Sequence, residues 1–202
     1  MIILKDITIK NFMSVGNVTQ AVKFSENGLT LVLGNNMDLG GDGSRNGTGK
    51  TTIINALSYA MYGNALTNIR KDNLVNKTNS KGMMVTLDFV KDGVNYRIER
   101  GRKPNIFRFL VNDQEQNEES NEAQGEMRQT QIVVEKLFGM THDMFKHIVA
   151  LNTYTEPFLS MRANDQRAII EQLLGITILS EKAEALKEKQ RLTKDAIKEE
   201  EY

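Results

Sequence analysis

With 202 residues, 40% of them hydrophobic and only two of them proline, the chain is long enough for one packed domain or for one domain with an appendage. Its 26 basic and 26 acidic side chains cancel, so the net charge argues neither for nor against a nucleic-acid ligand, and any basic surface has to be local. The lack of cysteine excludes a disulfide framework, and neither a signal-peptide core nor an apolar run of ~20 residues is found, so we predict a cytoplasmic protein without membrane contact.

Three strands are predicted in the first 33 residues. Residues 7–10 and 18–24 alternate between apolar and polar side chains, and a turn at Gly16-Asn17 separates them. Residues 29–33 are apolar on both faces apart from Thr30, which is typical of a buried strand.

The periodicity changes at Lys50. Apolar residues recur at helical spacing from there to Gly63, a residue that favours a helix C-terminus. Alternation over residues 85–89 and 96–98, around the turn KDG, predicts a hairpin, and residues 107–111 predict a shorter strand. Residues 112–125 are polar and without periodicity, which indicates a solvated loop.

The last third of the chain is predicted to be helical. Helices are expected at about 126–138, at about 142–150 behind Thr141 as N-cap, and behind Asn164 as far as Gly175. Residues 176–202 consist almost entirely of helix formers. Their seam residues are spaced alternately by four and three, as in a coiled coil, although a charged amphipathic surface helix would show a similar pattern: Leu179, Ala183, Leu186, Gln190, Thr193 and Ile197.

The stretch LVLGNNMDLGGDGSRNGTGKTT, residues 31–52, ends like a phosphate-binding loop. Its final part lies between an apolar run and an amphipathic helix, the context in which backbone N–H groups and the positive end of a helix dipole hold a phosphate. In such a loop the lysine reaches the β- and γ-phosphates and the hydroxyl residue after it ligates Mg²⁺. The pattern therefore predicts a nucleotide phosphate site at residues 46–52.

One glycine of the loop pattern is displaced. G-x-x-x-x-G-K-[ST] requires glycine five residues before Gly49, where this chain has Ser44. Gly34 directly follows the predicted strand 29–33, and joining it to residue 46 across an insertion at 35–45 restores the pattern. The other interpretation keeps Gly43 or Ser44 as the first residue of the loop and treats the rest as a long connection. We favour the insertion.

Four stretches carry a resemblance to a known family: LKDITIKNFMSVGN, NGTGKTTIINALSYAMYG, VTLDFVKDGVNYRIER and LNTYTEPFLSMRANDQRAIIEQLLG. They resemble the first strand, the phosphate loop G-x-N-G-x-G-K-[ST], the hairpin and the approach to the coiled coil of the SMC/SbcC-type ABC ATPases of DNA repair. The resemblance implies an α/β fold, namely the N-terminal lobe of an ABC-type P-loop ATPase head, with a mixed β-sheet and a P-loop helix, over residues 1–175. Residues 176–202 would be the start of a coiled-coil helix.

The resemblance also implies roles for single residues. Lys50 would be the catalytic phosphate contact, Thr51 the Mg²⁺ ligand, Ser14 a residue near the nucleotide, and Gly34 the first glycine of the loop. Met13 departs from the family, which usually has Arg or Lys there. The residues implied to grip ATP are Asn46, Gly47, Thr48, Gly49, Lys50, Thr51 and Thr52.

A further implied site residue follows Leu151. The family has a glutamine there, in a phrase like L-P-Q-G-E-F, whose side chain senses Mg²⁺ and the attacking water. Asn152 could supply the same amide with one methylene less, as a catalytic and metal-binding residue, and Thr153 could instead supply a hydroxyl. An ordinary loop between helices is the alternative.

Other parts of a complete ATPase of this family are missing from the sequence. No apolar run of four residues ends in Asp-Glu, there is no Ser-Gly-Gly signature, and His142 and His147 lie outside any motif. The resemblance thus implies an incomplete lobe of the ATPase subunit of an exo/endonuclease complex, which would regulate the nuclease at DNA ends. The implied partners are the C-terminal lobe of the same protein, a second copy as an ATP-dependent homodimer, a metallo-phosphoesterase nuclease subunit and DNA.

Basic residues cluster after the predicted P-loop helix and around the hairpin. Such local density fits a surface that follows DNA phosphates, although solvated strand edges also carry Lys and Arg. The residues predicted to contact DNA are Arg70, Lys71, Arg100, Arg102 and Lys103.

Three other functions fit parts of the sequence. An SMC- or RecF-like ATP-gated DNA clamp would use the same lobe without a nuclease partner. A GTPase would need N-K-x-D, whereas NKTN at residues 76–79 ends in Asn79. A structural coiled-coil protein with a coincidental loop would bind no nucleotide.

Overall fold

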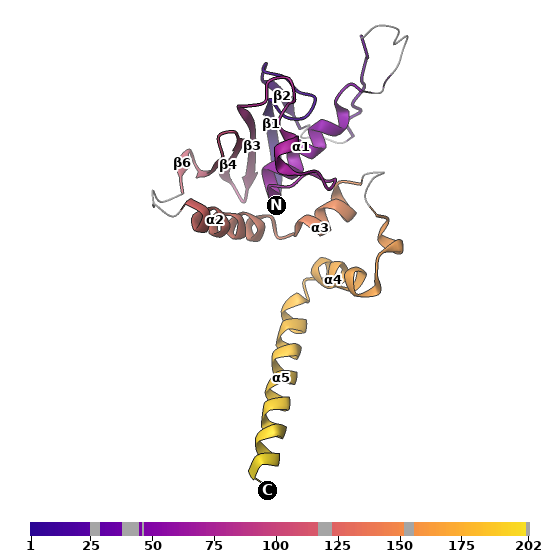
Figure 1. The fold of residues 1–202 in the computed structure, drawn as a ribbon, viewed down its shortest axis with the longest axis vertical. Coiled ribbons are helices and arrows are strands. Elements are labelled where there is room, and N and C mark those ends of the chain that lie inside the picture. The colour runs from indigo at the N-terminus through magenta and orange to yellow at the C-terminus, as the bar shows by residue number, and fades with distance from the viewer. Residues whose placement is uncertain (25–28, 38–44, 46, 117–122, 152–155, 201–202) are drawn as a thin grey trace. The chain divides into compact units, whose positions relative to one another are not determined.

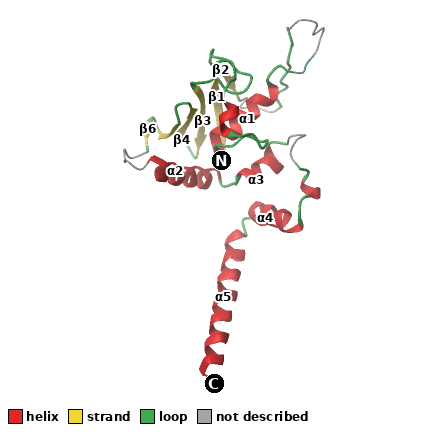
Figure 2. Ribbon diagram, in the orientation of Figure 1, coloured by secondary structure: helices red, strands yellow, loops and turns green. Residues whose placement is uncertain are grey.

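The structure is a computed structural model that describes residues 1–24, 29–37, 45, 47–116, 123–151 and 156–200 (Figure 1). The chain divides into two compact units, Met1–Phe145 and Lys146–Tyr202. The first unit contains the sheet and the helices that cover it. The second is helical in its described residues (Figure 2).

The sheet of the first unit has, within the described residues, the strand order β2-β1-β3-β4-β5-β6. Every described pairing is antiparallel, which departs from the predicted mixed sheet, while the predicted α/β class is confirmed. The strands are β1 (Ile2–Lys10), β2 (Gln20–Lys23), β3 (Met83–Lys91), β4 (Val94–Arg102), β5 (Ile106–Val111) and β6 (Gln114–Glu115).

One face of the sheet is buried by two helices. α1 (Lys50–Tyr62) packs against β1, β3 and β4 and also contacts α2 (Ala123–Phe138), whose Phe138 ring lies 4.9 Å from that of Phe89 in β3. Because side chains alternate along a strand, every second residue over most of β3 enters this core, and the residues between them are half-buried. The predicted hairpin and P-loop helix are confirmed, and Gly63 caps α1 in the left-handed conformation at φ 68°.

The predicted strand at residues 29–33 is wrong for this structure. Residues 29–37 form neither helix nor strand, and Leu29, Leu31 and Leu33 are 100%, 78% and 69% exposed. A strand that is apolar on both faces needs hydrogen-bonded neighbours and a cover on each face. Both sides of β1 are occupied by β2 and β3, and no other described strand pairs with this segment.

Further short helices continue the first unit and begin the second. Thr141 is the predicted N-cap of α3 (His142–Met144), and its hydroxyl accepts a hydrogen bond from the Met144 N–H. α4 (Ala163–Leu173) begins earlier than the predicted start behind Asn164, because the Arg162 carbonyl already accepts from the N–H groups of Asp165 and Gln166. The remaining short elements are η1 (Lys71–Leu74), the π-helix η2 (Phe145–Val149) and η3 (Phe158–Ser160).

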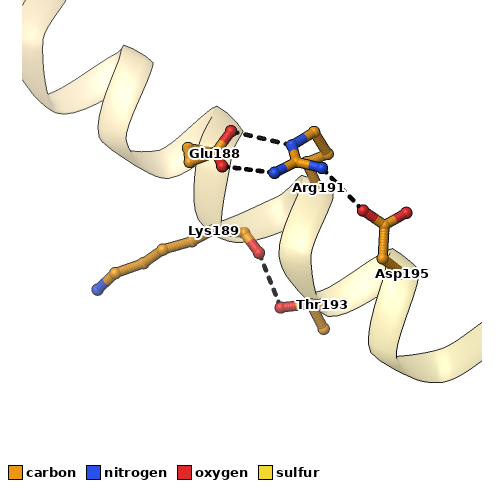
Figure 3. A network of polar contacts seen from close by, with 5 residues as sticks. All are labelled: Glu188, Lys189, Arg191, Thr193 and Asp195. Atoms are coloured by element: carbon orange, nitrogen blue, oxygen red, sulfur yellow. Dashed lines mark hydrogen bonds and ion pairs between the residues drawn. The ribbon is translucent and has the colours of Figure 1, made fainter. Parts of the chain in front are cut away.

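The predicted C-terminal helix is present as α5 (Thr177–Glu200). Arg191 donates to Glu188 one turn before it and to Asp195 one turn after it, at 2.8 and 2.9 Å, and Thr193 donates to the Lys189 carbonyl (Figure 3). Exposed pairs at these spacings stabilise a helix by a few tenths of a kcal/mol each, ~0.2–0.5. The seam residues Leu179, Leu186 and Ile197 are exposed, so pairing into a coiled coil stays a prediction. None of the helices in the described parts of the chain is long and apolar enough to cross a membrane.

Candidate nucleotide-phosphate site

The start of α1 is built by two glycines in conformations that other residues rarely adopt. Gly47 has φ 76° and Gly49, the N-cap, has φ 84°. Gly49 has no side chain that could cap the helix, and Thr52 N–H donates to the Gly49 carbonyl at 3.0 Å. The N–H groups at the N-terminus of a 13-residue helix, together with its positive dipole end, therefore remain available to an anion.

Lys50 lies over the loop that precedes it. Its ammonium donates to the Arg45 carbonyl and is 3.3 Å from the Thr48 hydroxyl. The hydroxyl of Thr51 belongs to the exposed part of the first turn, whereas Thr52 is buried. Among the described residues no group of three His, Cys, Asp or Glu side chains could hold a metal ion by itself. Of the two predicted metal ligands, Thr51 and Asn152, only Thr51 lies within the described residues.

Ser14 lies against the P-loop helix, and its role near the nucleotide stays a prediction. The Ser14 hydroxyl lies 2.9 Å from that of Thr52, and it would be 3.3 Å from a Cβ built on Gly49. The turn that carries Ser14 is held by a hydrogen bond from Met13 N–H to the Leu74 carbonyl at 2.7 Å. The end of β1 thus closes one side of the phosphate loop.

Gly34 also lies against the loop. A Cβ on Gly34 would be 1.9 Å from the Thr48 hydroxyl oxygen and 2.7 Å from its Cβ, so only glycine fits there. This close approach joins Gly34 to the phosphate loop across residues 35–45, which favours the insertion interpretation. Asn46, Gly43, Ser44, Asn152 and Thr153 lie outside the described residues, so their predicted roles stay predictions.

Buried polar groups fix the rest of α1. Asn55 donates to the Thr51 carbonyl and accepts from Leu66 N–H, both at 3.0 Å. Ser58 donates to the Asn64 carbonyl and lies 2.9 Å from Nε2 of His142, whose ring is 5.1 Å from that of Tyr62. His142 therefore packs α3 onto α1, a role that no local sequence signal indicated because the two residues are 84 positions apart.

The predicted DNA-contacting residues differ in their exposure to solvent. Arg70, Lys71 and Lys103 are exposed, and Arg102 is half-buried and bonded to Asp72 at 2.8 Å. Arg100 is only 8% exposed and does not fit a DNA-contacting surface. Its Nε donates to the Ala60 carbonyl at 2.7 Å, its guanidinium lies 3.7 Å from the centre of the Phe107 ring, and burial lowers its pKa to about 10.

Comparisons with known proteins show the family to which the chain belongs. A family model described as an AAA domain matches residues 6–202. Exonuclease subunit 2 of Enterobacteria phage T4 is 33% identical over 88% of the chain, and that of Escherichia phage RB69 is 31% identical over the same share. The DNA double-strand break repair Rad50 ATPase of Archaeoglobus fulgidus is 36% identical over 50% of the chain and 10% of its own length. The chain spans 29% of the length of the two phage proteins.

Solved structures show the same fold at low sequence identity. The Smc head domain with an extended coiled coil from Pyrococcus furiosus, bound to the C-terminal domain of ScpA, has a TM-score of 0.61 at 18% identity, over 95% of this chain and 46% of that one. A chain from a study of ATP-driven dimerization and DNA stimulated activation of SMC ATPases has a TM-score of 0.55 at 16% identity, over 85% of this chain and 99% of that one.

Proposed function

Because the chain belongs to the AAA-domain family and within it to the SMC/SbcC-type ATPases, we propose that it is the ATP-binding lobe of a DNA-repair ATPase. The observation that carries the proposal is the uncapped N-terminus of α1, where Gly49 in the left-handed conformation is followed directly by Lys50. This arrangement offers backbone N–H donors, a helix dipole and an ammonium group to one anion.

The described residues fit a Mg²⁺-bound nucleotide. Mg-ATP bound there would supply the γ-phosphoryl group for transfer to water. The N–H groups after Gly49 would hold phosphate oxygens, and Lys50 would exchange its bond to the Arg45 carbonyl for contacts with them. Thr51 would present its hydroxyl to the metal. Ser14, whose hydroxyl lies 2.9 Å from that of Thr52, keeps the end of β1 against the loop.

The exposed segment 29–33 supports a second part of the proposal. Its apolar residues need neighbours that the described residues do not provide, and a further lobe of the same protein could add strands beside it. We propose that this lobe also brings the groups that complete hydrolysis, and that two such heads close on ATP. In that state they would regulate a nuclease partner, which we propose is a metallo-phosphoesterase acting at DNA ends. The name of the phage relatives, exonuclease subunit 2, supports a nuclease complex and no more.

A clamp without a nuclease is the second candidate. The likeness in fold to an Smc head bound to the C-terminal domain of ScpA favours it. Copurification separates the two candidates. A metallo-phosphoesterase that stays bound to the chain and its neighbouring lobe supports the nuclease complex, and its absence under ATP-saturating conditions supports the clamp.

Replacing Lys50 by alanine tests the nucleotide site. We expect Lys50→Ala to abolish ATP binding, measured by calorimetry, while the circular dichroism spectrum and melting temperature stay those of the parent, because the ammonium opposes phosphate charge and supports no core contact. Lys77→Ala removes an exposed lysine outside the loop and serves as the control. Equal ATP affinity in the Lys50→Ala variant and the parent would refute the assignment.

A further inference from the structure

A cavity lined by cationic side chains lies in the first unit, at the other end of α1 from the phosphate loop. Its volume is about 280 Å³, and its walls come from the C-terminal turn of α1, η1, the ends of β4 and β5, and α2. Small-molecule sites usually have about 300–1,000 Å³, so this cavity suits a small group or one end of a larger ligand.

Four cationic side chains line this cavity: Lys71, Arg100, Arg102 and Arg128. The described lining residues include no acid. Asp72, just outside, is paired with Arg102, and Glu135, which helps to balance Arg100, accepts from Gln131 rather than from a cation. Positive charge is therefore in excess around the cavity.

The hydrogen bonds of these cationic side chains show which of them can still donate to a ligand. Arg100 donates to the Ala60 carbonyl and to Gln131, both of which are neutral, and stacks on Phe107. The negative end of the α1 dipole explains the presence of one cation here, because a buried guanidinium can donate hydrogen bonds to the last carbonyls of a helix. Among the described residues, neither the side chain of Lys71 nor that of Arg128 forms a hydrogen bond or an ion pair.

Two of the cations converge on the same point. A Cβ built on Gly63 would lie 3.1 Å from Nη1 of Arg100 and 3.8 Å from Nζ of Lys71. The protein atoms around the ammonium of Lys71 partly desolvate it and lower its pKa, although the residue as a whole is exposed, and the charges of Arg100 and Arg102 lower the pKa further. Two cations beside the same glycine, in a cavity whose described lining holds no acid, favour an anion as ligand.

We propose that this cavity binds a phosphate group, held by Lys71 and Arg128 with the buried guanidinium of Arg100 behind them. A phosphate offers several acceptor oxygens to converging donors, and charge-assisted hydrogen bonds of this kind are the strong ones. The aromatic rings of Tyr59 and Phe107 also line the cavity, whose volume of about 280 Å³ suits a group as small as one phosphate. The source is either free phosphate or the terminal phosphate of a nucleic-acid strand.

The test first removes phosphate binding by the loop at the start of α1. In a Lys50→Ala chain, inorganic phosphate is titrated and the backbone signal of Gly63 and the Nε–H signal of Arg100 are followed by ¹H–¹⁵N NMR. We expect saturable shifts of both signals. Adding Lys71→Gln and Arg128→Gln should weaken binding at least about tenfold, because two charge-assisted contacts are lost. The matched control, Lys77→Gln with Lys81→Gln, should bind as before.

A second arm identifies the source. A short oligonucleotide with a 5′-phosphate is compared with the same oligonucleotide carrying a 5′-hydroxyl. Tighter binding of the phosphorylated strand assigns the site to a strand end, and equal weak binding of both strands beside saturable inorganic phosphate assigns it to free phosphate. No shift with any probe, or equal affinity in the Lys71→Gln, Arg128→Gln variant, would overturn the proposal. ATP binding by a Lys71→Gln, Arg128→Gln chain with Lys50 intact reports on the phosphate loop separately.

Discussion

At Gly34 the position of Thr48 leaves no room for a side chain. The contact distances given above are far below those of ordinary van der Waals contact, and one of the two atoms is the rigid Cβ of a β-branched residue. Gly34 therefore holds the phosphate loop by close approach and not by turning the chain. A glycine that is needed only for a close contact can come from any part of the chain that reaches the loop. The loop pattern can therefore tolerate a displaced glycine.

Substituting Gly34 tests this contact. We expect Gly34→Ala to weaken ATP binding by about tenfold or more, because the added methyl displaces Thr48 and with it the N–H groups of the loop. Gly16→Ala is the control, since a Cβ there meets nothing nearer than 3.9 Å. Thr48→Gly in the same chain should restore part of the affinity. Calorimetry that finds parent affinity in Gly34→Ala would contradict the close approach.

Arg100 shows what the sequence could have revealed about single residues. Tyr96, Ile98 and Arg100 share one face of β4 because side chains alternate along a strand, and Ile98 is fully buried. The alternation that predicts the hairpin therefore also predicts that Arg100 faces the core. Its partners Ala60 and Gln131 could not be predicted, because they come from helices distant in sequence.

At the scale of elements, sequence patterns correctly predicted the elements that depend on interactions between residues close in sequence. The hairpin, the P-loop helix and the N-cap Thr141 follow from alternation, helical period and capping chemistry, each of which acts over a few residues. Residues 29–33 failed because their pattern specifies a strand only when neighbours exist. Position Asn164 failed as a cap because the backbone of Arg162 begins the helix first.

The exposed segment allows a prediction about stability. We expect Leu31→Glu to change the free energy of unfolding of the 202-residue chain by less than about 0.5 kcal/mol, because the side chain is already in water. Leu87→Ala, in the core of β3, should cost about 2–5 kcal/mol. Urea denaturation gives both values.

The same substitution should act on assembly. If a further lobe covers residues 29–33, Leu31→Glu places a charge in that contact, and a separately expressed C-terminal lobe should no longer bind the chain. A loss of stability of more than 2 kcal/mol in the isolated chain, which is the range of core truncations, would show instead that the segment packs within it.

For the molecule as a whole, we predict binding without turnover. Phosphoryl transfer depends on positioning and charge stabilisation around the γ-phosphate, and residues 1–202 supply only the loop, Lys50 and one metal ligand from their described part. A missing water-activating carboxylate or facing donor typically costs ~10²–10⁵ in rate. Steady-state phosphate release by the chain should be unmeasurable, and turnover that Lys50→Ala removes would contradict this.

At this scale the sequence predicts the chemistry of a site more readily than its arrangement. The loop motif predicts an anion site because glycine, lysine and threonine have chemistry that their identities fix, and that site stays a prediction. The basic residues were predicted to share one surface, yet the strand pleat turns Arg100 inward while Arg70 and Lys103 stay exposed. Which charges meet in a cavity depends on strand and helix packing, and that information is not local.

The pairing of β1 with β3 has a consequence for the insertion beside the phosphate loop. Lys10 pairs with Met84, so the whole phosphate loop and α1 lie inside one chain loop that the sheet closes. The entropy of closing a loop grows only with the logarithm of its length. Lengthening a closed loop of about seventy residues by about ten costs on the order of 0.1 kcal/mol. An enclosing loop this long lets sequence beside the nucleotide site grow or shrink during evolution with almost no penalty in folding free energy.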